Sequence, residues 1–320
     1  MMKFALRSLV LGLGFVAVAQ ANPLVGVSFY NYDDNFIQLM REKFEQKIAQ
    51  KPHLTVLLND AQNSQTVQND QVQTLLNKKA KVIAVNLVDP AASVTVIGKA
   101  KNQLNTPVIF FNKDPGEKAI NSYNNAYYVG TDPQQSGKIQ ADLIEKHWKA
   151  NPTLDLNHDD VIQYALLKGE SGHPDAEIRT RAVIEALEAK GFKTEAVEFD
   201  SAKWNKQIAK QKVTEWLAGD NRDKIEIIIA NNDAMALGAL EATRTQRKHL
   251  PIYGVDAMPD ALKLVKAGEL AGTVLNDTDR QVAEILSLTE KLATGQTVEN
   301  RVIRVPYVAV DSQNISQFIK

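Results

Sequence analysis

The stretch Val25-Gly26-Val27-Ser28-Phe29-Tyr30, followed by the polar loop Asn31-Tyr32-Asp33-Asp34-Asn35, decides the fold. The first run is apolar and strand-like, and a helical pattern of apolar residues follows the loop from residue 36 to residue 50. Strands that alternate with helices lie parallel in one sheet, because a helix must carry the chain back to the start of the next strand. The stretch therefore predicts an α/β fold that begins with a parallel strand.

The same alternation continues along the chain and restarts after Tyr127-Tyr128-Val129-Gly130. Further strands are predicted at residues 54–58, 82–86, 108–111, 161–167, 194–199, 225–230, 251–255 and 273–275, with an extended segment at 302–310. Further helices are predicted at residues 64–77, 90–104, 134–148, 176–190, 206–217, 235–245 and 280–293. This order predicts two similar doubly wound parallel-sheet lobes with right-handed crossovers.

The length of the chain also favours two lobes. The 320 residues exceed what one hydrophobic core usually holds. No Pro/Gly-rich linker separates the lobes, so we expect short crossovers that act as a hinge. We predict an amino-terminal lobe of residues 22–130 plus 276–304 and a carboxyl-terminal lobe of residues 131–275 plus 305–320.

The amino terminus has the pattern of a secretion signal. Lys3 and Arg7 give a basic start, Leu9 to Val18 form an apolar core, and Ala19-Gln20-Ala21 fits a small-x-small cleavage site. The apolar core is shorter than the ~20 residues of a transmembrane helix. We expect residues 1–21 to be a signal peptide cleaved after Ala21, and the mature protein to be periplasmic.

The composition excludes several classes of site and partner. The chain has no cysteine, which rules out disulfides, a thiol nucleophile and cysteine-ligated metals. The formal net charge of −1 argues against a nucleic-acid partner, which requires a basic surface. We expect a monomer.

Hydrogen-bonding side chains follow many of the predicted strands. These residues are Asp34, Asn112, Asn232, Asp256 and Asn276, and they are joined by the stretch His173-Pro174-Asp175-Ala176-Glu177-Ile178-Arg179. Open α/β sheets bind their ligands at the carboxyl ends of the strands, so we expect these side chains to converge. Carboxylates accept hydrogen bonds, arginine donates them and asparagine does both. This combination suits a small polyhydroxylated ligand better than a catalytic centre.

Each of these residues also has a simpler interpretation when it is taken alone. Asp34 and Asp175 could cap helices, and Arg179 could pair with Asp175 on the surface at a spacing of four. His173, Asn232 and Asp256 could be ordinary loop or turn residues, and Phe36 and Trp204 could belong to the core.

Seven blocks of sequence carry a family resemblance. They are Tyr32–Phe36, Asn86–Ala92, Phe110–Lys113, His173–Glu177 with Arg179, Ala230–Ala236, Gly254–Ala257 and Gly272–Asp277. They resemble the periplasmic glucose/galactose-binding proteins of enteric-type bacteria, and the likeness spans the mature chain. The resemblance implies the type I fold of periplasmic binding proteins. It places ten residues at the sugar: Asp34, Phe36, Asn112, His173, Asp175, Arg179, Trp204, Asn232, Asp256 and Asn276.

The resemblance also implies a function. Members of this family capture D-glucose and D-galactose in a cleft between the lobes and do not act as enzymes. Asp34 is expected to accept from the sugar 4-hydroxyl, with Phe36 and Trp204 stacking on the ring. The partners implied are a membrane ABC sugar permease and a chemotaxis receptor.

Three other functions compete with this interpretation. Asp34 with Asp256 or Asp175 could form the carboxylate pair of a periplasmic sugar hydrolase or epimerase. The chain could bind another monosaccharide, such as ribose or xylose. It could also be the sensor domain of a sugar repressor, although a secretion signal stands where such a repressor carries its helix-turn-helix.

A second site is predicted at Asp155-Leu156-Asn157-His158-Asp159-Asp160-Val161-Ile162-Gln163. The oxygen-bearing residues Asp155, Asn157, Asp159 and Gln163, with the carbonyl of Val161, follow the spacing of an EF-hand calcium loop. Position 6 is Asp160 in place of glycine, and position 12 is Leu166 in place of glutamate. The family takes its bidentate carboxylate from a distant strand, and Glu226 occupies that place here. We expect a structural Ca²⁺; an acidic loop without metal is the alternative.

Overall fold

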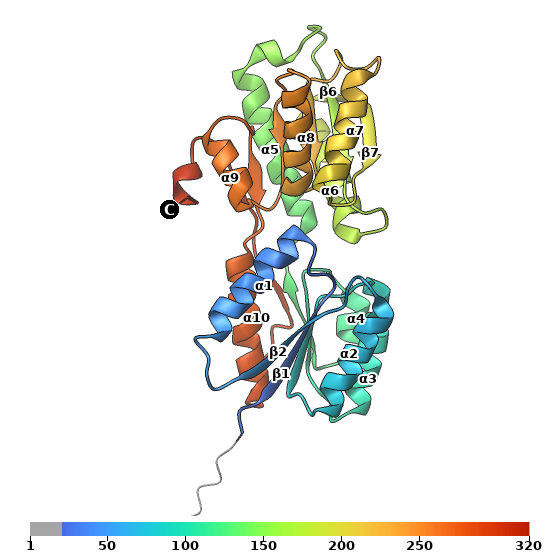
Figure 1. Cartoon of the computed structure of the whole chain (residues 1–320), viewed down its shortest axis with the longest axis vertical. Helices are drawn as coiled ribbons and strands as arrows, with labels where there is room; N and C mark the ends of the chain where they lie inside the picture. The colour runs from blue at the N-terminus through green and yellow to red at the C-terminus, as the bar shows by residue number, and fades with distance from the viewer. Residues whose placement is uncertain (1–20, 320) are drawn as a thin grey trace, which may run out of the picture.

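Each half of the molecule is a sheet between two layers of helices, and the two halves stack end to end (Figure 1). The computed structural model describes residues 21–319. The predicted signal peptide lies outside the described residues, except for Ala21. Among residues 21–319, no helix combines the length and the apolar character needed to cross a membrane.

The amino-terminal lobe is built on a sheet with the strand order β11-β5-β4-β3-β1-β2. Its strands are β1 (Leu24–Phe29), β2 (Thr55–Asp60), β3 (Val82–Val85), β4 (Val108–Phe111), β5 (Ala126–Gly130) and β11 (Val302–Arg304). All neighbouring pairs are parallel. The chain passes from β1 to β2 and then back to β3 on the other side of β1, so the topological switch point lies between β1 and β3.

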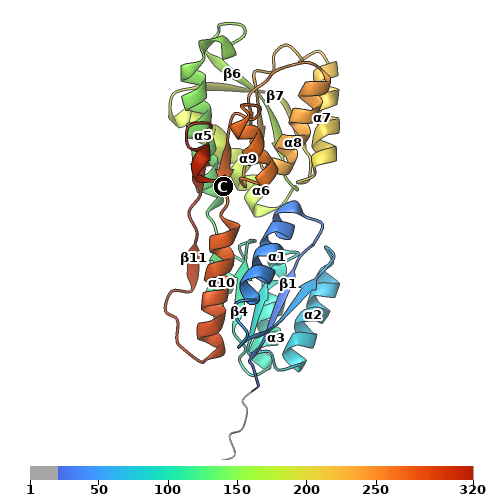
Figure 2. The ribbon, with the colours of Figure 1, turned by 60° about the vertical axis from the view of Figure 1, so that its left-hand side comes forward.

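Helices cover both faces of this sheet (Figure 2). One face carries α1 (Asn35–Ile48) and α10 (Thr278–Ala293), and the other carries α2 (Gln65–Asn77), α3 (Ser93–Asn102) and α4 (Glu117–Asn121), with a 3₁₀ turn at Pro90–Ala92. Each face has its own apolar core. Phe29, Phe44 and Ile285 belong to the first core, and Val72 and Val96 belong to the second.

The carboxyl-terminal lobe has the same plan. Its parallel sheet has the order β7-β6-β8-β9, with β6 (Val161–Lys168), β7 (Lys193–Ser201), β8 (Ile227–Ala230) and β9 (Ile252–Tyr253). One face packs on α5 (Pro133–Ala150) and α6 (Pro174–Ala189), and the other packs on α7 (Lys206–Ala218), α8 (Asp233–Thr245) and α9 (Pro259–Lys266). Short 3₁₀ turns lie at Pro152–Leu154 and Ile315–Gln317.

Two further strands extend this lobe. β10 (Thr273–Leu275) and β12 (Val308–Val310) form an antiparallel pair, and a bridge between Tyr253 and Gly272 attaches the pair to β9. The sequence did not predict this antiparallel pair. It arises because the chain returns from the other lobe after β11 and runs back along β10 in the opposite direction.

The predicted architecture of two parallel-sheet lobes is confirmed, with local differences. The helices α4 and α9 were not predicted, since each is too short to show a full helical period of apolar residues. The extended segment predicted at 302–310 divides between the two lobes, as β11 and β12.

The chain crosses between the lobes three times, after β5, after β10 and after β11. The first and third crossovers run side by side, because Val305 N–H donates to the carbonyl of Gly130 at 2.7 Å. Arg304 Nη1 donates to the carbonyl of Thr131 at 2.8 Å, and Tyr307 N–H donates to Gln135 Oε1 at 2.9 Å. Figure 2 shows these connections along one side of the molecule, beside α10. They form the geometry of a hinge.

Candidate functional site

A narrow cavity lies between the lobes, and all ten predicted site residues line it. The eleventh lining residue is Tyr30. Residues Tyr30, Asp34, Phe36 and Asn112 come from the amino-terminal lobe, and Asn276 lies on the second crossover. The other six come from the carboxyl-terminal lobe: His173, Asp175, Arg179, Trp204, Asn232 and Asp256.

Many of these residues lie in the segments that follow strands, as the sequence predicted. Asn112 follows β4, Asp256 lies beyond β9 and Asn276 follows β10. Asp34 and Asn232 are the N-caps of α1 and α8, the helices that follow β1 and β8. The carboxyl edges of the two sheets therefore face each other, and their loops supply the walls of the cavity.

Asp34 has two roles. Its Oδ1 accepts from Ile37 N–H at 3.0 Å, which caps α1, and its Oδ2 accepts from the hydroxyl of Tyr30 at 2.5 Å. An ionised carboxylate has about four lone-pair positions, so acceptor capacity remains toward the cavity. The capping role considered for Asp34 is thus real and coexists with its place in the cavity wall.

The N-cap of α6 is His173, not Asp175. His173 Nδ1 accepts from Asp175 N–H at 3.1 Å, so the ring proton lies on Nε2, which is free to donate. Burial, and then the charges of Lys113 and Arg179, lower the pKa of His173 to about 3. The imidazole is therefore neutral at physiological pH.

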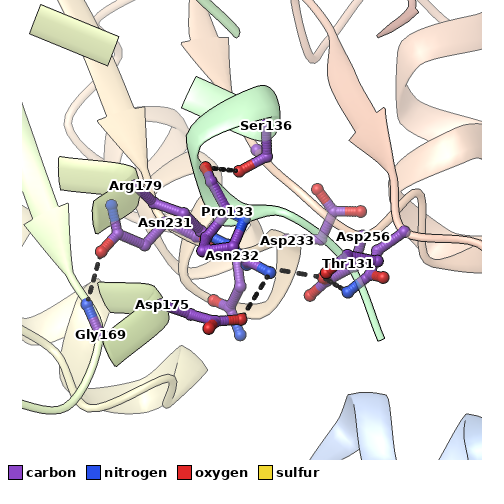
Figure 3. A network of polar contacts seen from close by, with 12 residues as sticks. Thr131, Pro133, Ser136, Gly169, Asp175, Arg179, Asn231, Asn232, Asp233 and Asp256 are labelled. Carbon is purple, nitrogen blue, oxygen red and sulfur yellow. Dashed lines mark hydrogen bonds and ion pairs between the residues drawn. The ribbon is translucent and has the colours of Figure 1, made fainter. Parts of the chain in front are cut away.

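Arg179 lies buried in the cavity wall, not on the surface as one interpretation of its spacing allowed. Its guanidinium is 3.6 Å from the carboxylate of Asp175 and 3.8 Å from that of Asp256 (Figure 3). Nη1 donates to the carbonyl of Asn231 and Nη2 donates to the hydroxyl of Tyr307, each at 2.9 Å. Burial lowers the pKa of Arg179, but the neighbouring Tyr307, Asp256 and Asp175 raise it by more, so the net shift is upward. Arg179 therefore stays a cation.

Asp256 is a carboxylate of the cavity wall whose pKa is raised. Burial raises its pKa to about 7, although Arg179 and a hydrogen bond from Asn276 act in the opposite direction. Asn276 Nδ2 donates to Asp256 Oδ1 at 3.2 Å, and Asn276 Oδ1 accepts from Gln281 at 2.7 Å. Asn276 thus links the carboxyl-terminal lobe to α10 of the other lobe.

The two aromatic residues predicted from the sequence reach the cavity from opposite lobes, Phe36 from α1 and Trp204 from the loop after β7. The indole of Trp204 packs edge-on against His173, with ring centroids 5.2 Å apart. Gly169 permits this position, because a Cβ there would meet the indole at 2.3 Å. The two rings give the polar cavity apolar surfaces in opposite lobes.

Three lining residues have backbone angles that side chains rarely adopt. The φ angles are +62° at Asn112, +64° at Trp204 and +120° at Asp256. Such conformations cost free energy and persist where the surrounding structure enforces them, often at functional sites. Here they direct side chains from the strand ends into the cavity.

A sequence model of the periplasmic binding protein domain family matches residues 25–297. The chain belongs to this family. Over 308 residues it is 54% identical to the D-galactose/methyl-galactoside binding periplasmic protein of Haemophilus influenzae, with 94% of this chain and 93% of that protein covered. The family predicted from the sequence blocks is confirmed, and it is a family of binding proteins, not enzymes.

Solved structures of this family share the fold. An ABC transporter solute binding protein of Bacillus halodurans with bound myo-inositol superimposes with a TM-score of 0.82 at 27% identity, covering 94% of this chain and 98% of that one. A myo-inositol binding protein of Caulobacter gives a TM-score of 0.79 at 25% identity, with coverage of 95% and 98%. The predicted two-lobed type I fold is confirmed.

The sequence analysis missed three residues that shape the site. Tyr30 lines the cavity, Tyr307 holds Arg179, and Lys113 lies buried with Nζ 3.9 Å from the centre of the Tyr30 ring. Lys113 stands in one of the family blocks, and Tyr30 ends the first strand run, so a signal existed for both. Tyr307 lies in an extended segment whose sequence gives no sign of its partner.

In the predicted calcium loop, the acidic side chains accept hydrogen bonds from groups of the loop itself. Asp155 accepts from the backbone N–H groups of Asp159 and Asp160 at 3.2 and 3.1 Å, and Asp159 Oδ2 accepts from Asn157 and Gln163, both at 2.9 Å. Asp160 has a φ of +58°, so it adopts the left-handed conformation at the position where glycine usually stands.

Glu226 reaches the loop from just before β8. Its two oxygens accept from Leu156 N–H at 2.7 Å and Gln163 N–H at 2.9 Å. Burial raises the pKa of Glu226, and the charges of Asp155 and Asp159 raise it further. Within residues 21–319, no three His, Cys, Asp or Glu side chains form a metal-ligand cluster, so a cation would also need amide and carbonyl oxygens.

Proposed function

We propose that this chain is a periplasmic binding protein that captures D-galactose and D-glucose and delivers them to a membrane ABC sugar importer. One observation carries the proposal: three carboxylates, one guanidinium, one imidazole and three amides from both lobes and the hinge converge on one cavity. A hexose presents many hydroxyl groups, each of which donates once and accepts up to twice. The cavity offers matching acceptors and donors.

The contacts described above give each group a part in sugar recognition. Asp34, Asp175 and Asp256 accept from hydroxyl groups, while Arg179 and His173 Nε2–H donate to sugar oxygens. The 4-hydroxyl distinguishes the two epimers, and a carboxylate such as Asp34 can accept from either configuration. Phe36 and Trp204 cover the apolar faces of the ring.

The relative from Haemophilus influenzae supports this choice of sugar, because its name records D-galactose and methyl-galactoside and it is 54% identical to this chain. Direct binding of this chain to either sugar is the decisive measurement. We expect calorimetry on the mature protein to show saturable binding of D-galactose and D-glucose and much weaker binding of D-ribose and L-arabinose. Preference for a pentose would contradict the proposal.

The competing enzymatic function is tested on the same samples. A binding protein releases its ligand unchanged, so chromatography after prolonged incubation should recover the sugar intact. A new product would favour a hydrolase or an epimerase that uses a carboxylate pair.

A structural Ca²⁺ at the loop Asp155–Gln163 is a further part of the proposal. Gln163 Oε1 is buried and has no hydrogen-bond partner, which leaves an oxygen free for a hard cation. Asp155, Asn157, Asp159, Gln163, Glu226 and the carbonyl of Val161 would hold the ion. A cation would offset the repulsion among the gathered carboxylates and tie the loop to β8.

Export and partners stay predictions for this chain. The signal peptide at residues 1–21 is tested by amino-terminal sequencing of the mature protein, which should begin at Asn22. A periplasmic domain of a chemotaxis receptor, mixed with sugar-loaded and sugar-free protein, tests the second partner. Binding should depend on sugar, since a ligand stabilises the state that it prefers.

A further inference from the structure

Tyr30 stands between the cavity and a buried cation. The residue follows β1, is 8% exposed and contributes its ring to the cavity wall. Its backbone N–H donates to Asn86 Oδ1 at 3.4 Å. On the ring face, Lys113 Nζ lies 3.9 Å from the centroid, and the same ammonium donates to the carbonyl of Val88 at 3.0 Å. These contacts fix the position of the phenol ring.

The hydroxyl of Tyr30 is committed to a single acceptor. It donates to Asp34 Oδ2 at 2.5 Å, a distance typical of a hydrogen bond from a hydroxyl to an ionised carboxylate. Burial raises the pKa of Tyr30 well above its usual value, and the charge of Asp34 raises it further. The phenol therefore remains a donor throughout the physiological pH range.

This bond constrains how Asp34 can meet a ligand. Ile37 N–H occupies one lone-pair position on Oδ1, and the Tyr30 hydroxyl occupies one on Oδ2. Both carboxylate oxygens are thereby held, and only the remaining lone pairs point toward the cavity. Two hexose epimers differ in the direction of one hydroxyl group, so a fixed carboxylate treats them unequally. A carboxylate that can rotate adapts to both.

We propose that Tyr30 is a specificity-determining residue: its hydroxyl fixes the carboxylate of Asp34 and thereby sets the ratio of affinities for D-galactose and D-glucose. This inference rests on the proposed function. Lys113 is a positioning residue that acts through the Tyr30 ring.

The test is Tyr30→Phe, which keeps the ring and its contact with Lys113 and removes only the hydroxyl. We expect both sugars to bind about tenfold or more weakly, because the carboxylate of Asp34 is no longer held in place and must be ordered when the sugar binds. We also expect the ratio of the two dissociation constants to move toward one by at least threefold. Calorimetry with each sugar on wild type and variant measures this ratio.

Tyr123→Phe is the matched control. Tyr123 is also buried and also donates through its hydroxyl, to the carbonyl of Thr106 at 3.1 Å, but it does not line the cavity. Its substitution should lower the melting temperature without changing either affinity. If the loss of any buried hydroxyl changed sugar affinity through the fold alone, Tyr123→Phe would change the two affinities as Tyr30→Phe does.

Each remaining outcome is decisive. Equal weakening for the two sugars, with the ratio unchanged, overturns the specificity role of Tyr30, as does unchanged binding. Wild-type protein that binds neither sugar refutes the proposed function itself, and the inference fails with it. Wild-type binding with an altered ratio in Tyr30→Phe alone supports both.

Discussion

Asp34 shows at the scale of one residue how a structural role and a binding role combine. Its Oδ1 caps α1, and its carboxylate also faces the cavity. We expect Asp34→Ala to weaken D-galactose binding about 100-fold, because sugar hydroxyls lose a charged acceptor. The lost cap should cost about 1 kcal/mol, a fall of about 2–4 °C in melting temperature. Calorimetry and thermal unfolding measure the two effects separately.

Ser64→Ala provides the comparison for Asp34→Ala. Ser64 caps α2 by accepting from Val67 N–H at 3.4 Å and lies outside the cavity lining. Its loss should lower stability to a similar extent and leave affinity unchanged. Wild-type affinity in Asp34→Ala would show that the sugar binds elsewhere.

We expect the titration of Asp256 to make sugar affinity depend on pH. Burial raises the pKa of Asp256 to about 7, so the carboxyl takes up a proton as the pH falls through this value and loses acceptor capacity. We expect the affinity for D-galactose to fall about tenfold between pH 8 and pH 6. His173 contributes nothing to this slope, since its pKa lies near 3. Calorimetry across this range should show the change, and Asp256→Asn should abolish it.

The contribution of Asp256 to stability should respond to pH in the opposite direction. The folded state holds the proton of Asp256 up to about pH 7, whereas the unfolded chain releases it near pH 4. Between these values Asp256 is more protonated in the folded state than in the unfolded chain, so its contribution to the free energy of unfolding falls as the pH rises. Asp175 adds to this slope, because burial raises its pKa too. The part of the pH dependence of the free energy of unfolding that is absent in Asp256→Asn measures the contribution of Asp256.

Residue-scale prediction from the sequence succeeded where the chain carries short, ordered blocks. All ten predicted residues line the cavity because strand ends meet at one edge of each sheet. The site roles of Tyr30 and Tyr307 were not predicted, since an aromatic residue in an apolar run looks like an ordinary core residue. The partner of Tyr307 becomes visible only when distant segments are brought together, whereas Tyr30 bonds Asp34, four residues further along the chain.

At the scale of elements, strongly periodic helices were predictable and short ones were not. α5 and α10 lie close to their predicted bounds, whereas α9 has only eight residues and was missed. The antiparallel pairing of β10 with β12 depends on the route of the chain between the lobes. No local pattern of apolar residues encodes that route.

The loop at Asp155–Gln163 is the element whose stability should depend on metal. We expect added Ca²⁺ to raise the melting temperature of the chelator-treated protein by about 5 °C, because an ion that binds only the folded state stabilises it. Glu226→Gln should lose most of this increase, since Glu226 would supply the bidentate carboxylate of the proposed site. Thermal unfolding with and without a chelator measures both.

Glu195→Gln serves as the control for Glu226→Gln. Glu195 is exposed on β7, directly beside Gln163 in the strand register, and makes no contact with the loop oxygens named above. This variant should keep the full response to Ca²⁺. If a chelator leaves the melting temperature of wild type unchanged, the loop is an acidic turn without metal.

At the scale of the whole molecule, the hinge and the cavity share hydrogen bonds. Tyr307, on the third crossover, accepts from Arg179 Nη2 at 2.9 Å and from Thr131 Oγ1, on the first crossover, at 2.8 Å. Asn276, on the second crossover, bonds Asp256. Every crossover therefore contacts a cavity residue directly or through one intermediate.

We expect Tyr307→Phe to reduce D-galactose affinity about tenfold, because a buried N–H of Arg179 loses its acceptor. Small-angle scattering should show that wild-type protein contracts when sugar is added, and that the variant contracts only at higher sugar concentration. Tyr123→Phe should behave as wild type in both measurements. An unaltered affinity in Tyr307→Phe would show that this contact between the third crossover and Arg179 does not contribute to sugar binding.

The three crossovers also govern when the molecule can fold during synthesis. α10 and β11 belong to the amino-terminal lobe, yet they lie late in the chain, within residues 278–304. Val282, Ile285 and Leu286 fill the same apolar core as Phe29 and Phe44. The amino-terminal lobe thus leaves the ribosome first but cannot complete its fold until α10 and β11 have been synthesised. Until then the apolar core that α10 covers stays exposed and accessible to chaperones.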